Sequence, residues 1–192
     1  MDPKVVTNAL YRDELIADLR SIPTMSIVLP TPDLFGPANG IYYNSHLVGD
    51  SWERQASVEF IRPDGSTGFQ ENCGLRIWGT GWRPNATTPK HALQLKFKNR
   101  YGAGRLEYPL FPDAPVAEFD NLVLRAQGSR GWTDFRQPDI EQSQYIHDGW
   151  ARDTARAMHK VDGHATYVHL YLNGLYWGLY NLCARPNDDL AA

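Results

Sequence analysis

The sequence predicts an α+β fold, a mainly antiparallel sheet with a packed helix, in a single domain of 192 residues. Thirteen prolines and sixteen glycines indicate many turns and short strands. Several stretches alternate apolar and polar residues, as half-buried strands do, and one longer stretch repeats its apolar residues at helical spacing. A hydrophobic content of 42% is enough for a real core.

The first predicted elements are a helix and a strand. Apolar residues recur at helical spacing over residues 10–20, and Pro23 ends that helix. A β-type run follows over residues 24–29. We expect residues 1–9 to be disordered, and the start of the chain shows neither the apolar region nor the cleavage site of a secretory signal.

The middle of the chain predicts the sheet. Residues 52–78 indicate a hairpin that turns at residues 63–66, where Pro-Asp-Gly-Ser supplies turn chemistry. Residues 91–98 and 121–127 alternate in the same way and predict two further strands.

A long helix is predicted to begin at Asp139 and to end near Gly163. Gln142 stands where it would complete a capping box with Asp139. We expect the apolar stripe of this helix to pack on the sheet. The stripe consists of Ile146, Trp150, Thr154, Ala157 and Met158.

The last segment predicts a hairpin with a two-residue type I′ turn at Asn173–Gly174. Such a turn pairs Val168 with Leu179 and Leu170 with Trp177. The face assigned to the core consists of Val168, Leu170, Leu172, Leu175, Trp177 and Leu179.

His169 is then expected opposite Gly178, on a face with Tyr167, Tyr171, Tyr176 and Tyr180. The spacing of the histidines at 159, 164 and 169 matches no usual zinc pattern, so a packing role for His169 is favoured.

Composition excludes several function classes. The net charge of −3 argues against nucleic-acid or anionic-membrane binding driven by bulk charge, although a local basic patch stays open. No apolar run approaches the roughly 20 residues that span a bilayer. Cys73 and Cys183 make neither a disulfide framework nor a zinc site. Neither a Gly-x-Ser-x-Gly element nor a Walker loop nor the standard kinase motifs are present.

A glycine-rich connection over residues 77–83 is followed by cations that could share a sheet face. Lys90 and Lys96 have the same strand parity, and Arg76 ends the preceding strand on its non-core side. Backbone N–H groups and aligned ammonium groups are what phosphate recognition needs. On the bare pattern, the alternative of a turn beside a solvated sheet face is favoured.

Arg125 lies on an otherwise apolar strand, where arginine needs a partner. It forms a structural ion pair with Asp148 or Asp153, or it reaches an anion. The structural interpretation is the favoured one.

Several runs of residues together resemble the CotH kinase family, named for a spore-coat protein kinase. The most specific is the block Leu-Asn-Gly-x-Tyr-Trp-Gly-x-Tyr at residues 172–180. In chain order, the runs are residues 74–77, 89–91, 95–98, 108–111, 119–125, 145–148 and 169–181. The resemblance covers nearly the whole chain from about residue 10, and its closest forms occur in large bacterial surface or secreted proteins.

The resemblance implies the N-terminal part of an atypical protein-kinase-like fold, which binds ATP with a divalent metal such as Mg²⁺ and phosphorylates Ser or Thr in a protein substrate. In such a fold the strand-rich part holds the nucleotide phosphates. Lys90 and Lys96 become phosphate-binding candidates, with Arg76 and Arg125 in ancillary roles. The covering loop would contain Gly79, Gly81 and Arg83.

Two departures from the family bear on activity. Ala184 stands where a glutamate is expected, and the chain ends at Ala192, where the family continues into its catalytic carboxylates. No catalytic or metal-binding residue is therefore predicted here, and a C-terminal remainder is expected as partner. The sequence predicts the nucleotide side of a CotH-like kinase that is inactive alone. The alternative is a non-catalytic binding or structural module of a surface or secreted protein.

Overall fold

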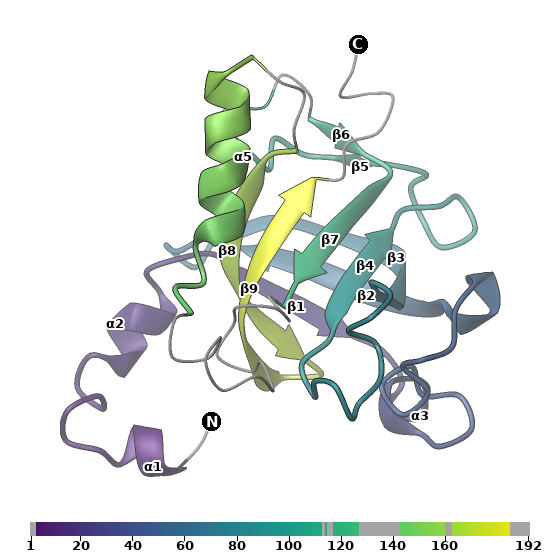
Figure 1. The fold of residues 1–192 in the computed structure, drawn as a ribbon, viewed down its shortest axis with the longest axis horizontal. Helices are drawn as coiled ribbons and strands as arrows, with labels where there is room; N and C mark the ends of the chain where they lie inside the picture. Colours follow the sequence, from purple (N-terminus) through teal and green to yellow (C-terminus); the bar gives the residue numbers. More distant parts are fainter. Residues whose placement is uncertain (1–2, 113, 115–116, 127–142, 160–162, 185–192) are drawn as a thin grey trace.

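The computed structural model describes residues 3–112, 114, 117–126, 143–159 and 163–184. Within these ranges, seven strands close into a barrel in the order β1-β2-β3-β4-β7-β9-β8 (Figure 1). Neighbouring strands are antiparallel, except that β1 pairs in parallel with β8 and so closes the barrel. The barrel strands are β1 (Thr24–Val28), β2 (Arg54–Ile61), β3 (Thr67–Trp78), β4 (Ala92–Lys96), β7 (Asn121–Arg125), β8 (Ala165–Leu172) and β9 (Leu175–Ala184).

Smaller elements surround the barrel. A two-stranded ribbon pairs β5 (Leu106–Glu107) with β6 (Glu118–Phe119). The helices are α1 (Pro3–Val6), α2 (Leu15–Leu19), α3 (Thr31–Phe35), the 3₁₀ helix η1 (Asp50–Trp52) and α5 (His147–Ala157). In the part of the chain that the structure describes, none of the helices has the length and apolar character needed to cross a membrane.

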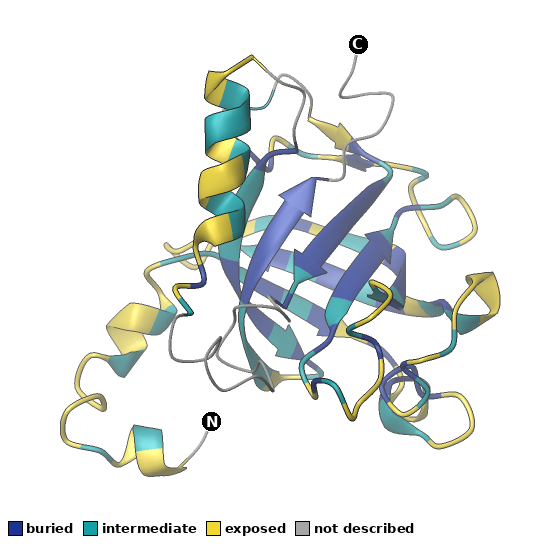
Figure 2. Cartoon of the chain, in the orientation of Figure 1, coloured by how far each residue is buried: buried dark blue, intermediate teal, exposed yellow. Residues whose placement is uncertain are grey.

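The barrel interior is largely apolar because most inward positions of its strands are apolar, as the alternation predicts. Ile27, Val58, Leu75, Leu95 and Leu124 are fully buried there, and Figure 2 shows the barrel strands as the buried part of the molecule. The predicted α+β class with a mainly antiparallel sheet is confirmed. A filled interior leaves the outer faces and the ends of the barrel for binding.

The predicted register of the last hairpin is correct only beside the turn. Leu172 pairs with Leu175, but a bulge then shifts the pairing by one residue. Leu170 therefore lies opposite Gly178, and His169 lies opposite Leu179, not opposite the glycine.

The bulge also reverses which residues of β9 face inward. Beyond the bulge, Tyr180, expected on the tyrosine face, is fully buried with the core, whereas Leu179, expected in the core, is only partly buried. Leu175 lies before the bulge and keeps its predicted pairing with Leu172, but it is 57% exposed, not in the core. A β-bulge adds one residue to one strand and so exchanges its two faces. His169 does keep a packing role, since Nδ1 lies 3.1 Å from the Tyr176 hydroxyl and Nε2 lies 3.2 Å from the Asp18 carbonyl oxygen.

The predicted packing of the long helix is wrong. Ile146, Trp150 and Met158 of the expected core-facing stripe are 55%, 70% and 63% exposed. The helix instead contacts the barrel through polar side chains: Asp148 pairs with Arg125 on β7, and Arg152 binds Asp148 and the Gly163 carbonyl oxygen. The expected capping residues at 139 and 142 lie outside the described residues.

The N-terminal helix is shorter than predicted. The residue 10–20 segment is helical only in α2, which buries none of its residues. Apolar periodicity alone overestimates the length of such a helix, because short helices depend on tertiary packing for stability. Within residues 1–9, Pro3–Val6 form α1, which likewise buries no residue.

Candidate functional site

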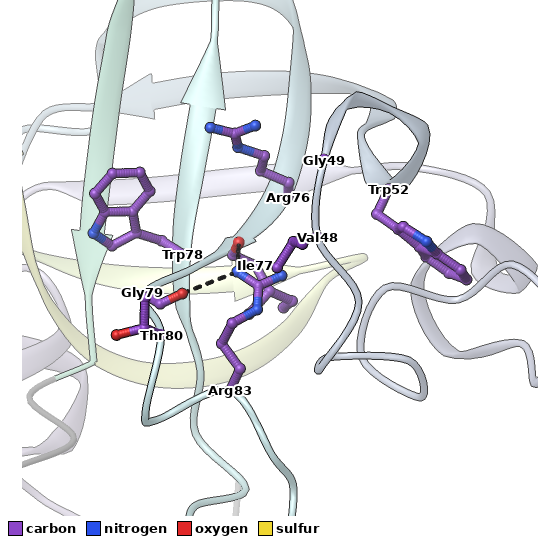
Figure 3. A pocket seen from close by; sticks show the side chains of 9 residues that line it. All are labelled: Val48, Gly49, Trp52, Arg76, Ile77, Trp78, Gly79, Thr80 and Arg83. Atoms are coloured by element: carbon purple, nitrogen blue, oxygen red, sulfur yellow. Dashed lines mark hydrogen bonds between the residues drawn. The ribbon is translucent and has the colours of Figure 1, made fainter.

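A cavity of about 300 Å³ opens on the outer side of the barrel, where β3 ends (Figure 3). One wall comes from β3 and the turn after it, and the other from the loop that leads into η1. Figure 3 shows Arg76 and Trp78 on one side and Val48 on the other. The lining residues are Val48, Gly49, Trp52, Arg76, Ile77, Trp78, Gly79, Thr80 and Arg83.

Arg83 is the structural brace of this cavity. Its buried guanidinium donates to the carbonyl oxygens of Ser45, Ile77, Gly79 and Leu47. Burial, followed by the nearby charge of Arg76, lowers the pKa of Arg83. These bonds fix the cavity's two walls to each other and occupy most of the donors that would otherwise reach a ligand.

The two glycines predicted for a covering loop differ. Gly79 lines the cavity with a φ of 99°, a left-handed conformation that favours glycine. Gly81 does not line it, and a side chain there would meet open space. Only Gly79 therefore has a structural reason to be glycine at this place.

Three cations gather on the outer face beside the cavity. Arg76 and Lys98 both lie near the exposed Asp50 carboxylate, at 3.6 Å and 3.8 Å. Lys96 lies on β4 and points outward, since its neighbour Leu95 is buried inside the barrel. Burial and the charges of Arg76 and Lys98 lower the pKa of Lys96.

Lys96 differs from its neighbours because it has no ion-pair partner, although the charges of Glu53 and Asp50 offset part of the repulsion from Arg76 and Lys98. Arg76 donates from Nε to Gln94 Oε1 at 2.7 Å, and Lys98 binds a carboxylate. Within the described part of the chain, the Lys96 ammonium group forms neither a hydrogen bond nor an ion pair. It is thus the cation best placed to receive an anion.

Glu53 holds the base of this face. Its side chain is fully buried and accepts from Lys98 Nζ at 2.9 Å and 3.1 Å, from the Tyr101 hydroxyl at 3.0 Å, and from Arg100. Burial alone would raise the pKa of Glu53, but these hydrogen bonds outweigh it and lower the pKa. A side chain at position 74 would meet the Glu53 carboxylate at 2.5 Å, which explains the glycine there.

Lys90 lies elsewhere, at the end of the barrel. Its ammonium group donates to the Leu179 carbonyl oxygen at 2.7 Å and to the Tyr145 hydroxyl at 2.9 Å, and lies 4.6 Å from the centre of the Tyr180 ring. Burial lowers the pKa of Lys90 to about 8. The shared face that strand parity suggested for Lys90 and Lys96 is not formed, because Lys90 precedes β4 and turns toward β9.

Arg125 forms the structural ion pair that the sequence favoured. Its Nη2 lies 3.2 Å from Asp148 Oδ1 on α5, and Asp148 also binds Arg152. Arg125 therefore fastens α5 to the barrel.

The structure thus divides the predicted site residues. It brings Arg76, Gly79 and Arg83 together around the cavity and places Lys96 beside Arg76, whereas Lys90, Arg125 and Gly81 lie apart from the cavity lining. Sequence reasoning missed Val48, Trp52, Asp50 and Glu53. The only signal was the position of Glu53 directly before an alternating strand, a weak one for a buried carboxylate.

The described residues do not fit a magnesium site. Among them no group of three or more His, Cys, Asp or Glu side chains is placed to hold a metal ion. Of the two carboxylates near Lys96, Glu53 accepts from Lys98, Arg100 and Tyr101, and Asp50 lies against Arg76 and Lys98 with no second free carboxylate beside it among the described residues. Magnesium needs several oxygen ligands in near-octahedral geometry.

Comparison with models of known protein families and with curated proteins finds no match to this chain.

Proposed function

We propose that the outer face formed by β3 and β4 binds the phosphate groups of a nucleoside triphosphate, with ATP suggested by the CotH resemblance. The observation that carries this proposal is the unpaired ammonium group of Lys96, crowded by Arg76 and Lys98. A bound polyanion would relieve this repulsion. A hydrogen bond between charged groups is worth about 1.5–3 kcal/mol.

Local charge supports an anion at this place. Four cations, Arg76, Lys96, Lys98 and Arg100, share two carboxylates, those of Asp50 and Glu53. The face is therefore positive although the chain as a whole carries a net charge of −3. Such a local excess attracts anions more strongly than the net charge suggests.

The cavity beside Trp78 suits the uncharged part of the ligand. Its volume of about 300 Å³ is at the low end for small-molecule sites, so it has room for a base and not for a whole nucleotide. Val48, Ile77 and Trp78 are among its apolar lining residues, and Arg76 joins it to the cationic face. The base would lie in the cavity and the phosphates outside it, toward Lys96.

By this proposal the barrel is the nucleotide side of a CotH-like kinase. Phosphoryl transfer requires both positioning of the phosphates and neutralisation of charge, with a base for the accepting hydroxyl. The cationic face would position the phosphates and neutralise part of their charge. Because the described carboxylates near Lys96 do not fit a metal, we derive no transfer step for this chain, and a protein substrate and a complementary catalytic part belong to the proposal alone.

Calorimetric titration with ATP tests the proposal directly. Wild type should bind ATP in EDTA as well as with Mg²⁺, because the cations and not a metal hold the phosphates. Lys96→Met should weaken binding by about 10- to 100-fold, the equivalent of one charged hydrogen bond. Lys4→Met on α1 removes the same charge far along the chain and should leave the affinity unchanged. No binding by wild type, or equal loss in both variants, would refute the proposal.

A second candidate, a non-catalytic binding or structural module, is favoured by Ala184. Its side chain is buried in the barrel core, where a carboxylate would be costly. The glutamate that the family resemblance calls for has no solvent-facing place at this position. An assay of γ-phosphate transfer to a general protein substrate should be negative under both candidates, so the calorimetric titration with ATP separates them: a module without a nucleotide site should not bind ATP.

A further inference from the structure

A second cavity, of about 320 Å³, lies at another end of the barrel, where β1 begins and the β2–β3 hairpin turns. Leu19, Ile22 and Ile61 are the apolar residues of its lining. Arg20 and Arg62 are its cationic residues. Nothing in the proposed nucleotide site uses these residues.

Arg62 is held in place and still has free donors. Its Nη1 donates to Ser66 Oγ at 3.1 Å and to the Thr67 carbonyl oxygen at 3.0 Å, and its guanidinium lies 5.7 Å from the centre of the Tyr108 ring. Within the described ranges, Nε and Nη2 have no partner. These two donors form the edge with which arginine binds a carboxylate in a bidentate manner.

Arg20 adds a second cation. In the described part of the chain its guanidinium makes neither an ion pair nor a hydrogen bond. The segment that carries Arg20 is anchored to the barrel, since His169 Nε2 on β8 lies 3.2 Å from the carbonyl oxygen of Asp18 in α2. The two arginines are therefore brought to one opening by elements far apart in the sequence.

The nearby Asp64 does not cancel these charges. Its Oδ1 accepts from the Ser66 hydroxyl at 2.7 Å and from the Ser66 N–H at 2.9 Å, so this oxygen is committed to the hairpin turn. These bonds from Ser66 lower the pKa of Asp64. Among the residues that line the cavity, one carboxylate against two guanidinium groups leaves a net positive charge beside apolar side chains.

We propose that this second cavity binds a small aliphatic carboxylate, with the carboxylate on Arg62 and Arg20 and the aliphatic group against Leu19, Ile22 and Ile61. A volume of about 320 Å³ fits one amino-acid-sized group. The same chemistry is offered by the C-terminal residue of a peptide and by a free short-chain carboxylic acid.

Titration of the ¹⁵N-labelled chain, followed by amide chemical shifts, tests this inference. The probes are N-acetyl-L-leucine, its neutral amide N-acetyl-L-leucinamide, and hexanoate. Saturable shifts at Gly65 and Thr24 are expected with the acid and not with the amide, which should bind at least tenfold more weakly. Tighter binding of acetyl-leucine than of hexanoate would assign the site to a peptide terminus, and the reverse order would assign it to a free acid.

Variants separate a built site from surface charge. Arg62→Gln should reduce the affinity for N-acetyl-L-leucine at least tenfold, and Arg20→Gln, at an exposed position, should reduce it without a risk to folding. Arg12→Gln removes an exposed arginine outside the cavity and should have no effect. The inference is overturned if neither carboxylate gives saturable shifts, if the amide binds as well as the acid, or if all three variants behave alike.

Discussion

Two lysines that look alike in the sequence occupy opposite situations in the molecule. Lys90, at the barrel end, has its ammonium group bonded to two neutral oxygens and covered by the Tyr145 and Tyr180 rings. Lys96, on the outer face, lies near the cations Arg76 and Lys98. The carboxylates of Asp50 and Glu53 are also near, but Lys98 already contacts both of them. The first is part of the structure, and the second is available to a ligand.

The difference shows that contacts, not strand parity, decide what a lysine does. The end of β4 keeps Lys96 outward, whereas the irregular segment before β4 lets Lys90 reach across to β9. Burial without a carboxylate lowers the pKa of Lys90 to about 8, because a desolvated ammonium group favours its neutral form. Substitutions at the two places should therefore separate stability from binding.

The largest effect is expected from Glu53→Gln, which would break the outer face. This change leaves Lys98 and Arg100 beside a neutral amide. We expect a loss of about 3 kcal/mol in unfolding free energy at pH 7. This is the low end for a broken buried ion pair, because both cations are partly exposed. Urea unfolding measures it. Asp50→Asn, at an exposed carboxylate with longer contacts, should cost less than about 0.5 kcal/mol.

The pH dependence of this loss has a definite sign. The folded pKa of Glu53 lies below its usual value of 4.5, so its contribution is fully present above about pH 4.5 and disappears as pH falls through the folded pKa. Wild type and Glu53→Gln should therefore converge in acid. A difference that stays constant down to pH 3 would show that packing, not charge, makes Glu53 important.

Lys90→Met sharpens the comparison from the other side. The folded pKa of Lys90 is about 8 against 10.5 for the free side chain, so between these values the unfolded state holds more protons and stability rises with pH. The stability of wild type minus that of Lys90→Met should rise by about 2 kcal/mol from pH 7 to pH 9.5, at about 1.4 kcal/mol per pH unit.

Taking the difference between the two proteins removes the titration of tyrosines and cysteines common to both. Tm by circular dichroism at several pH values is sufficient. A flat difference would mean that the Lys90 ammonium group is solvated, and the contrast between the lysines would then be lost.

Much of the fold follows from alternation, because a strand with one buried face must alternate. The hairpin over residues 52–78 and the strands at β4 and β7 were predictable in this way. The bulge in β9 was not, since its residues alternate equally well in either register and only tertiary packing selects Tyr180 for the core. The same limit explains α5, where the Arg125–Asp148 ion pair and not the apolar stripe sets the orientation.

The candidate site was predictable only in its β3 part. Arg76, Gly79 and Arg83 lie close in the sequence and therefore close in space. Val48 and Trp52 reach the cavity through a loop that Arg83 ties down, and no local pattern in residues 44–52 announces this contact. Long-range contacts made by irregular segments leave no periodic signal.

Gly178→Ala tests whether the bulge maintains the Lys90 end. Gly178 has a φ of 114°, which an alanine adopts only with strain, and a loss of about 1–2 kcal/mol is expected. A Cβ there would lie 3.5 Å from Lys90 Nζ, an ordinary contact, so backbone conformation and not collision causes the loss. Gly81→Ala, in open space without a positive φ, is the matched control and should be neutral in chemical denaturation.

The smallest expected change in stability comes from Lys96→Met, and it is the most informative about function. Removing one of three crowded cations from an exposed face should change the unfolding free energy by less than about 0.5 kcal/mol, with relief of repulsion against Arg76 and Lys98 as the only gain. ATP affinity should nevertheless fall by about 10- to 100-fold, whereas Lys90→Met should leave it unchanged. If Lys90→Met weakened ATP binding as much as Lys96→Met, measured on folded protein by calorimetry, the barrel end would belong to the ligand site. The assignment of Lys90 to structure alone would then be wrong.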